Sequence, residues 1–379
     1  MMRRLRYIDF SLYAPLFGIL ALLWVALYSA TQFGQAGEAL RQAAYIAVGT
    51  AAMFGFTAMD YRHLKRLSIP LYFVTAATLA LVLVAGQSVN GSQRWLSLGP
   101  LGTFQPSELA KLTAIVTASV ILAPKLTVKR ALAAAAALGP LFLLILIQPD
   151  LGTSLVLVAV GGALAYVAGV NGTFLFASAG LGVAALPMVL KEYQRDRLMV
   201  FVNPDIDPKG MGYQLVQSQT AIGSGGIFGK GLMKGHMTQH GFVPENWTDF
   251  IFTVVGEELG LLGGCGLLLM FILLFVLILY TGYKSVDRLG GLLCTGVATL
   301  LLFQVFVNMG MTIGLAPVVG LPLPFGSYGG SAILVYMSAI GMVGSVRIQS
   351  RIPEDPLSDS AHPSMEGPAV GSLVGGLVD

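Results

Sequence analysis

Long apolar runs alternate with short polar connections along this chain of 379 residues. A window of about 20 apolar residues is enough to cross the hydrocarbon core of a bilayer. The runs lack the alternation of polar and apolar positions that marks a transmembrane strand. The pattern predicts an all-α polytopic membrane protein with about ten transmembrane helices. The expected spans are 11–30, 42–59, 67–86, 106–123, 131–148, 153–170, 173–190, 250–281, 290–312 and 329–347.

Composition agrees with a membrane protein. Charged residues make up 11% of the chain, against about 25% in soluble proteins. The formal charge of +3 is too small to indicate nucleic-acid binding. The only two cysteines, Cys265 and Cys294, lie inside apolar runs, so we interpret them as small core residues and not as a disulfide or metal pair.

Basic residues predict the orientation of the spans in the membrane. If the N-terminus is cytoplasmic, short outer loops hold only Arg41 and Arg94, and the positive-inside rule is satisfied. Both termini are therefore expected in the cytoplasm, with one membrane domain over 1–351. The long polar loop at about 191–247 then faces outward, and the Pro-, Ser- and Gly-rich tail at 352–379 is expected to be disordered.

Several charged residues stand where lipid or apolar protein is expected. Asp249, in PENWTDFIF, lies at the edge of an apolar run, where a carboxylate is costly and usually functional. Glu108 and Lys111, three residues apart, share a helix face. They form either an ion pair that packs helices or an intramembrane site. Asp150, in QPDLGTS, caps the next helix, lines a cavity, or does both.

The predicted topology brings these residues to one side of the membrane. Five outer segments carry polar groups, which indicates a single outward-facing cavity and argues against a pure scaffold. The candidate residues of this cavity are Arg94, Glu108, Asp150, Asp249 and, in the segment PFGSYGGSA, Ser327.

The long loop adds further basic candidates. Arg195 and Arg197, in YQRDR, are expected to clamp a phosphate or carboxylate, or else to bind anionic lipid headgroups. Lys230 lies in AIGSGGIFGKG, which either cradles a phosphate with backbone amides or only forms tight turns. This string fails the Walker pattern, which requires glycine where Ser224 stands and serine or threonine where Gly231 stands. Nucleotide binding is therefore not predicted.

Two further pairs of residues are candidates for function. His236 and His240 are four apart, but no glutamate follows the first histidine, so a zinc site is not predicted. Glu257 and Glu258 lie inside the eighth apolar run, which is expected to begin with a short bent or re-entrant piece before Glu258. At least one of the two carboxylates is expected to face a polar cavity or to bind a proton.

Nine strings in a fixed order resemble the SEDS family of bacterial cell-wall polymerases. The resemblance is closer to the elongation type, RodA, than to the division type, FtsW. Gly326 is the one small departure, since a bulkier residue is expected before SYGG. The strings, which run from Gln93 to Ala332, are QRWL, QPSELAKL, QPDLGTS, YQRDR, NPDIDPKGMGYQ, QSQTAIGSGGIFGKG, FVPENWTDFIF, GEELG and PFGSYGGSA.

The resemblance implies a peptidoglycan glycosyltransferase of the bacterial cytoplasmic membrane, acting on lipid II, the undecaprenyl-diphosphate-linked disaccharide-pentapeptide. It implies a role in cell elongation and rod shape. The family's essential aspartate corresponds to Asp249, and the family also depends on residues matching Glu108, Lys111 and Asp150. A class B penicillin-binding protein, a transpeptidase, and other membrane proteins of the elongation complex are the implied partners. A divalent cation, Mg²⁺ or Mn²⁺, is the implied cofactor.

The chemistry of lipid II suggests a role for each candidate. Attack of an acceptor sugar hydroxyl on the anomeric carbon, with inversion, needs a base and a stabiliser of the departing diphosphate. We expect Asp249 to be the base, or alternatively a ligand of the divalent cation. Arg94, Arg195, Arg197, Lys230 and Ser327 are further candidates for binding the substrate.

Two alternatives remain open. A lipid II flippase would use polar sites near the middle of the membrane, and the intramembrane Glu108 and Lys111 would suit it. A scaffold for the transpeptidase would not need Asp249.

Overall fold

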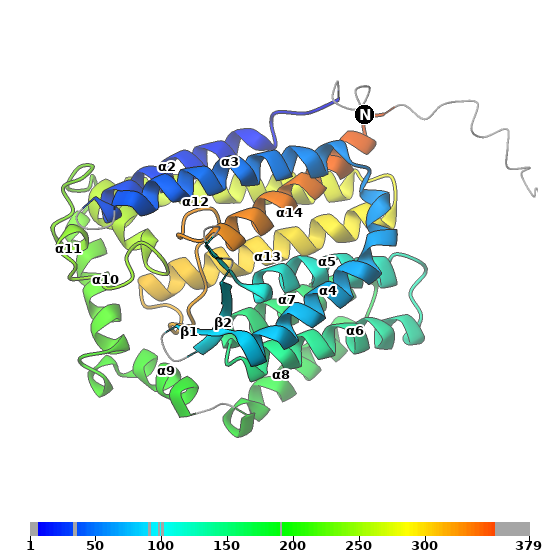
Figure 1. Ribbon diagram of the computed structural model, residues 1–379, viewed down its shortest axis with the longest axis horizontal. Coiled ribbons are helices and arrows are strands. Elements are labelled where there is room, and N and C mark those ends of the chain that lie inside the picture. Colours follow the sequence, from blue (N-terminus) through cyan, green and yellow to red (C-terminus); the bar gives the residue numbers. More distant parts are fainter. Residues whose placement is uncertain are drawn as a thin grey trace, which may run out of the picture.

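The structure is a computed structural model that describes residues 7–32, 36–89, 92–97, 99, 102–189 and 192–352. Long helices run side by side along one axis, and shorter helices gather at one end (Figure 1). The long helices are α2 (Tyr13–Thr31), α3 (Ala36–Ala58), α4 (Leu64–Ala85), α5 (Pro106–Leu122), α6 (Val128–Ile147), α7 (Leu151–Ala168), α8 (Gly172–Val189), α12 (Ile251–Tyr283), α13 (Arg288–Thr312) and α14 (Gly330–Gln349). The shorter elements are η1 (Tyr61–His63), α9 (Glu192–Val202), η3 (Pro204–Ile206), α10 (Met211–Gly225) and α11 (His236–Gln239).

The prediction of a polytopic helical membrane protein is confirmed. Within the described residues, seven helices are long and apolar enough to cross a membrane: α2, η1 with α4, α6, α7, α12, α13 and α14. Helix α8 contributes a shorter apolar segment, Gly172–Gly182. Helices α3 and α5 fill two more predicted spans and carry charged residues at their starts. The count of ten spans therefore stays a prediction.

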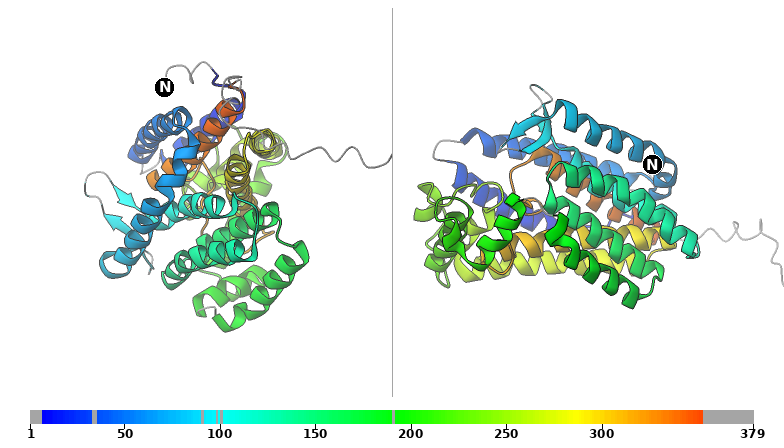
Figure 2. Two further views of the ribbon diagram at one scale, coloured as in Figure 1. Left: turned by 90° about the vertical axis from the view of Figure 1, so that its right-hand side faces the viewer. Right: turned by 90° about the horizontal axis from the view of Figure 1, so that it is seen from below.

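The two ends of the described chain meet at one end of the helix bundle. Arg347 of α14 donates from Nε to the Asp9 carboxylate at 2.9 Å, and Arg351 bonds the same carboxylate. Helices α9, α10 and α11 lie at the opposite end, which is also clear when the bundle is seen from below (Figure 2). The two ends therefore lie on the same side, as an even number of spans requires. The predicted tail falls outside the described residues from residue 353 onward.

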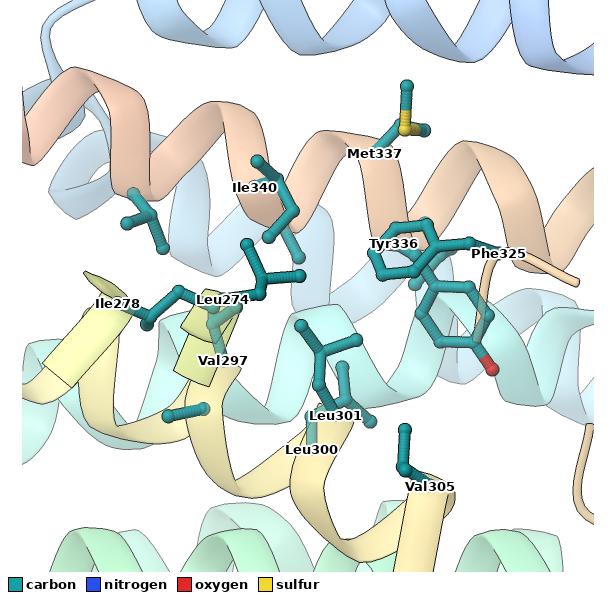
Figure 3. Close-up of a cluster of buried hydrophobic side chains, with 14 of the residues drawn as sticks. Leu274, Ile278, Val297, Leu300, Leu301, Val305, Phe325, Tyr336, Met337 and Ile340 are labelled. Carbon is teal, nitrogen blue, oxygen red and sulfur yellow. The ribbon is translucent and has the colours of Figure 1, made fainter. Parts of the chain in front are cut away.

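The core lies between α12, α13 and α14 (Figure 3). Association of helices in a membrane depends on close packing, because lipid is as apolar as the side chains that pack. Small residues provide the close approach of α14 to α3, where a Cβ atom at Gly341 would overlap the Met53 carbonyl. The labelled core side chains are Leu274, Ile278, Val297, Leu300, Leu301, Val305, Phe325, Tyr336, Met337 and Ile340.

Helix α12 is broken at Gly260, which has φ 65° and ψ −161°. Only glycine readily adopts this conformation. The chain at 226–231 packs into the break, where Leu261 N donates to Gly226 O at 2.9 Å and Lys230 N donates to Glu257 O at 3.0 Å. A break in this helix was expected before Glu258, and the structure has it at Gly260, two residues after Glu258.

Replacing Gly260 by alanine is expected to destabilise the fold by at least about 1–3 kcal/mol. The new Cβ atom would overlap the Gly229 nitrogen and lie 2.7 Å from the Ile227 carbonyl oxygen. The thermal unfolding temperature of the purified protein measures the effect. Gly266→Ala in the same helix is the matched control, since its Cβ would meet nothing within 4 Å. Equal unfolding temperatures for the two variants would contradict this account of the break.

A small antiparallel sheet joins α4 to α5, and hydropathy alone did not predict it. Its strands are β1 (Gln87–Val89), β2 (Ser92–Ser97) and β3 (Thr103–Phe104), in the order β1-β2-β3. Leu96 of β2 pairs with Phe104 of β3. Strands of two to six residues are too short to give a periodic signal in a hydropathy pattern. The sheet matters for function because β2 carries Arg94.

Candidate functional site

Asp249 lies on the turn that precedes α12, at the same end of the bundle as α9–α11. Its backbone is held from two sides. Asn308 of α13 donates from Nδ2 to Asp249 O at 2.8 Å, and Ser327 Oγ donates to Thr248 O at 2.6 Å. The turn is therefore fixed both to a long helix and to the segment that precedes α14.

The Asp249 side chain is partly buried, and among the described residues its carboxylate accepts no hydrogen bond. Gly320 lies next to both this side chain and Arg197 of α9, because a Cβ atom there would be 3.5 Å from both Arg197 Nη1 and Asp249 Oδ2. Burial, together with the charge of Glu245, raises the pKa of Asp249 to about 6, and the charge of Arg197 opposes this rise. Such a carboxyl group is mostly ionised at neutral pH and still binds a proton readily.

Asp150 caps α7, as one of its two sequence-based interpretations predicted. Its Oδ1 accepts from Thr153 N at 3.1 Å, and its Oδ2 accepts from Thr153 Oγ1 at 3.0 Å. Ser107 of α5 also donates to Oδ2, at 3.2 Å. The buried carboxylate thus ties the start of α7 to the start of α5. Direct contact of Asp150 with a substrate stays a prediction.

Arg94 of β2 contacts the turn between α6 and α7, which holds Asp150. Its Nε donates to Gln148 O at 3.1 Å, its Nη2 donates to Pro149 O, and its Nη1 lies 3.9 Å from Asp150 Oδ1. The charges of Arg94 and Asp150 both act on the pKa of Asp249. Arg94 therefore contacts Asp150, and the charges of both residues reach Asp249. A single outward-facing cavity that also includes Glu108 and Ser327 stays a prediction.

Glu108 and Lys111 form an ion pair inside the bundle. Lys111 Nζ lies 2.6 Å from Glu108 Oε1, and the two side chains are 0% and 3% exposed. The Lys111 ammonium also lies 5.3 Å from the centre of the Tyr336 ring, so the pair contacts α14. Glu108 Oε2 and the amide of Gln304 on α13 are buried without a hydrogen-bond partner among the described residues. The pair belongs to a polar patch between α5, α13 and α14.

Lys230, Glu257 and Glu258 hold the long loop against α12. Lys230 Nζ lies 2.6 Å from Glu257 Oε1, and Thr238 N also donates to Glu257, at 2.9 Å. Glu258 accepts from Ser29 Oγ at 2.5 Å and from Met233 N at 3.0 Å. Both glutamates therefore face hydrogen-bond donors of the folded loop and of α2, and binding of a proton by either stays a prediction. Binding of a phosphate by Lys230 stays a prediction.

The two arginines of α9 differ in their surroundings. Arg197 is partly buried and donates from Nη1 to Val318 O at 3.3 Å, next to the glycine that also lies beside Asp249. Arg195 is exposed. The structure therefore brings Arg197 to the site around Asp249 and leaves Arg195 at the surface.

Sequence reasoning missed three residues at or near the site: Asn308, Gln304 and Tyr336. All three lie inside long apolar helices, where a single amide or phenol changes the hydropathy of the run very little. Polar residues within a membrane span are themselves a signal of function. That signal, applied to α13, would have pointed to Asn308 and Gln304.

The fold and the site define a polytopic membrane protein in which Asp249 lies at the end of the bundle opposite Asp9 and Arg351. The sequence matches the FtsW, RodA and SpoVE family of cell cycle proteins over residues 6–352. The chain belongs to this family, the SEDS family, as its nine strings indicated.

Proteins with similar sequences are named peptidoglycan glycosyltransferases. The peptidoglycan glycosyltransferase MrdB of Escherichia coli (strain K12) is 36% identical over 347 residues, which cover 88% of this chain and 93% of that protein. The probable peptidoglycan glycosyltransferase FtsW of Trichlorobacter lovleyi is 36% identical over 315 residues, 80% of this chain and 81% of that one.

Solved structures share the fold. One is a chain from work on the structural coordination of polymerization and crosslinking by a peptidoglycan synthase complex, with a TM-score of 0.77 and 33% identity over 91% of this chain and 99% of that one. Another is the rod shape determining protein RodA of Thermus thermophilus, with a TM-score of 0.70 and 31% identity over 91% of this chain and 98% of that one.

Proposed function

We propose that this chain is a peptidoglycan glycosyltransferase of the elongation type, which polymerises lipid II at the outer face of the bacterial cytoplasmic membrane. Its termini would lie in the cytoplasm. The names of its relatives support the activity, and the similarity to MrdB and RodA supports the elongation role. The observation that carries the proposal is Asp249, a partly buried carboxylate beside Arg197, held in place by α13 and by the segment before α14.

In the proposed reaction, Asp249 takes the proton of an acceptor sugar hydroxyl. The hydroxyl oxygen forms a bond to the anomeric carbon of the donor lipid II, and the bond to the diphosphate breaks. The diphosphate keeps the electron pair and leaves as undecaprenyl diphosphate, with inversion at the anomeric carbon. General-base help of this kind contributes about 10²–10⁴-fold to the rate.

Arg197 is suited to the charge that develops on the leaving diphosphate. A guanidinium group can donate two parallel hydrogen bonds to phosphate oxygens. Arg197 and Asp249 both lie next to Gly320, since a Cβ atom there would be 3.5 Å from Arg197 Nη1 and from Asp249 Oδ2. The base and the cation therefore face one space from two elements, α9 and the turn before α12.

A divalent cation, Mg²⁺ or Mn²⁺, fits this arrangement. Among the described residues no cluster of three or more His, Cys, Asp or Glu side chains is placed to hold a metal. Magnesium is commonly held by one or two carboxylates together with substrate phosphates and water. In the alternative to its role as base, Asp249 would be that carboxylate. When bound, the ion would neutralise charge on the diphosphate.

We also propose a class B penicillin-binding protein as the partner, together with other membrane proteins of the elongation complex. The similarity to a chain of a peptidoglycan synthase complex supports this pairing.

The test is a polymerisation assay with purified protein, labelled lipid II and a divalent cation, with and without the transpeptidase. A gel should show a ladder of glycan strands for the wild-type protein and none for Asp249→Ala. No ladder under any condition would overturn the proposal. Transport of lipid II across reconstituted vesicles in that case would identify a flippase, for which the buried Glu108–Lys111 pair would then be the site to test.

A further inference from the structure

Asn308 of α13 makes an unusual pair of contacts. Its side chain is fully buried, and its single amide nitrogen donates to Asp249 O and to Leu321 O, both at 2.8 Å. A side-chain amide group has two N–H donors. Both donors of Asn308 are therefore committed to backbone carbonyls of two separate segments.

The second of these segments reaches Arg197. Leu321 is three residues beyond Val318, whose carbonyl accepts from Arg197 Nη1 at 3.3 Å. Gly320 lies between these two residues in the sequence. A Cβ atom placed on Gly320 would be 3.5 Å from both Arg197 Nη1 and Asp249 Oδ2. Asn308 thus fastens two segments to one position of α13. One is the turn that carries Asp249, and the other is the segment that accepts a hydrogen bond from Arg197.

The same segment also touches the start of α7. A Cβ atom at Gly152, two residues after Asp150, would lie 2.8 Å from Leu321 Cγ and 3.0 Å from Val319 O. The segment around Leu321 is therefore closely packed against α7 and has little freedom to move. A displacement at Asn308 would be passed to the Asp249 turn, which is also held by hydrogen bonds from Ser327 Oγ to Thr248 O and from Tyr328 N to Trp247 O.

A long helix is a better anchor for a reactive group than a loop. Groups that react must be held within a fraction of an ångström, and sites built on helices are more precise than sites built on loops. Asp249 itself lies on a turn, and Asn308 lies in α13, which spans 25 residues. Its two hydrogen bonds transfer the rigidity of the helix to both walls of the site.

We propose that Asn308 is a positioning residue, which fixes Asp249 relative to Arg197 and so sets the turnover number of the polymerase. The inference rests on the proposed function. Removal of the amide leaves the carbonyls of Asp249 and Leu321 without this donor. Because packing against α7 holds the Leu321 segment, the Asp249 turn is the part that shifts. A misplacement of about 1 Å at a catalytic group costs about 10²-fold in rate. Because Asn308 itself lies behind the backbone of the site, binding of lipid II should not change.

Three variants of the full-length protein test this proposal in the polymerisation assay. Asn308→Ala removes the amide, and Asn308→Leu removes it while keeping a side chain branched at the same position. Ser345→Ala is the matched control at the opposite end of the bundle, where Ser345 Oγ donates to Met59 O and accepts from Tyr61 N at 3.0 Å. For each protein, kcat and KM for lipid II and the unfolding temperature are measured.

The expected result is a fall in kcat of about 10²-fold for both Asn308 variants, with KM unchanged. Ser345→Ala should keep the wild-type kcat even where its unfolding temperature falls. If Asn308→Ala does not fold, Asn308→Leu decides. A wild-type kcat for Asn308→Leu would overturn the inference, because packing alone would then be sufficient. An equal loss of kcat in Ser345→Ala would also overturn it. Absence of activity in the wild-type protein would instead contradict the proposed function.

Discussion

Asp249→Asn is expected to lower the rate of lipid II polymerisation by about 10²–10⁴-fold at neutral pH. Asparagine has the size of aspartate but accepts no proton from the acceptor hydroxyl, and it binds a divalent cation weakly. The initial rate of glycan formation, measured with and without the transpeptidase, gives the effect. A near-normal ladder from Asp249→Asn would contradict both proposed roles of this residue, as base and as metal ligand.

The loss should not come from misfolding. Burial raises the pKa of Asp249 from 3.8 to about 6, so the folded state binds this proton more tightly than the unfolded state does. The contribution of this group to stability is therefore full below about pH 4 and is lost as the pH rises through 6. Asparagine carries no charge at any pH. At pH 7 the variant should unfold at the same temperature as the wild-type protein or at a higher one, which a thermal scan checks.

The same shift predicts the pH profile of the wild-type enzyme. A base with a pKa of about 6 is protonated, and therefore inactive, below that value. The kcat/KM for lipid II should fall tenfold per pH unit as the pH drops below about 6. The residual rate of Asp249→Asn should not show this fall at low pH. The groups whose charges act on this pKa are Glu245, Arg197, Asp150 and Arg94. A wild-type profile that is flat between pH 5 and pH 7 would contradict general-base catalysis by Asp249.

The sequence alone was sufficient for the helical membrane class and for the main acidic residues. Both depend on local signals: runs of apolar residues, and carboxylates that interrupt or border them. Asp150 illustrates this well, because an aspartate between two apolar runs is an expected helix cap, and it caps α7. Its contact with Arg94 required only that the outer loops meet at one side of the membrane.

The sequence did not predict contacts between distant segments. Glu258 accepts a hydrogen bond from Ser29, 229 positions earlier, and no spacing rule connects the two. Asn308 is a single amide in an apolar helix, and its role follows only from the two carbonyls that it meets. Gly326 departs from the expected family pattern for a reason visible only in the packing: a Cβ atom there would lie 2.7 Å from Leu23 Cδ1.

Lys111→Ala is expected to destabilise the protein by about 3–5 kcal/mol. Lys111 and Glu108 are almost completely buried, 2.6 Å apart, so the variant leaves the Glu108 carboxylate without its cation inside the bundle. The yield of folded protein and its unfolding temperature should both fall sharply. Activity of this variant is uninformative by itself, since unfolding and loss of function would look alike.

The double variant Glu108→Leu with Lys111→Met separates the two interpretations of the pair. Replacement of a buried ion pair by apolar residues of similar volume is often neutral or stabilising, and methionine can still pack on the Tyr336 ring that Lys111 now faces. We expect this variant to regain the stability lost in Lys111→Ala and to remain inactive. Recovered polymerisation would show that the pair only packs α5 against α14. A folded but inactive protein would place the pair in the function of the site, because the charges of Glu108 and Lys111 would be removed while the protein stays folded.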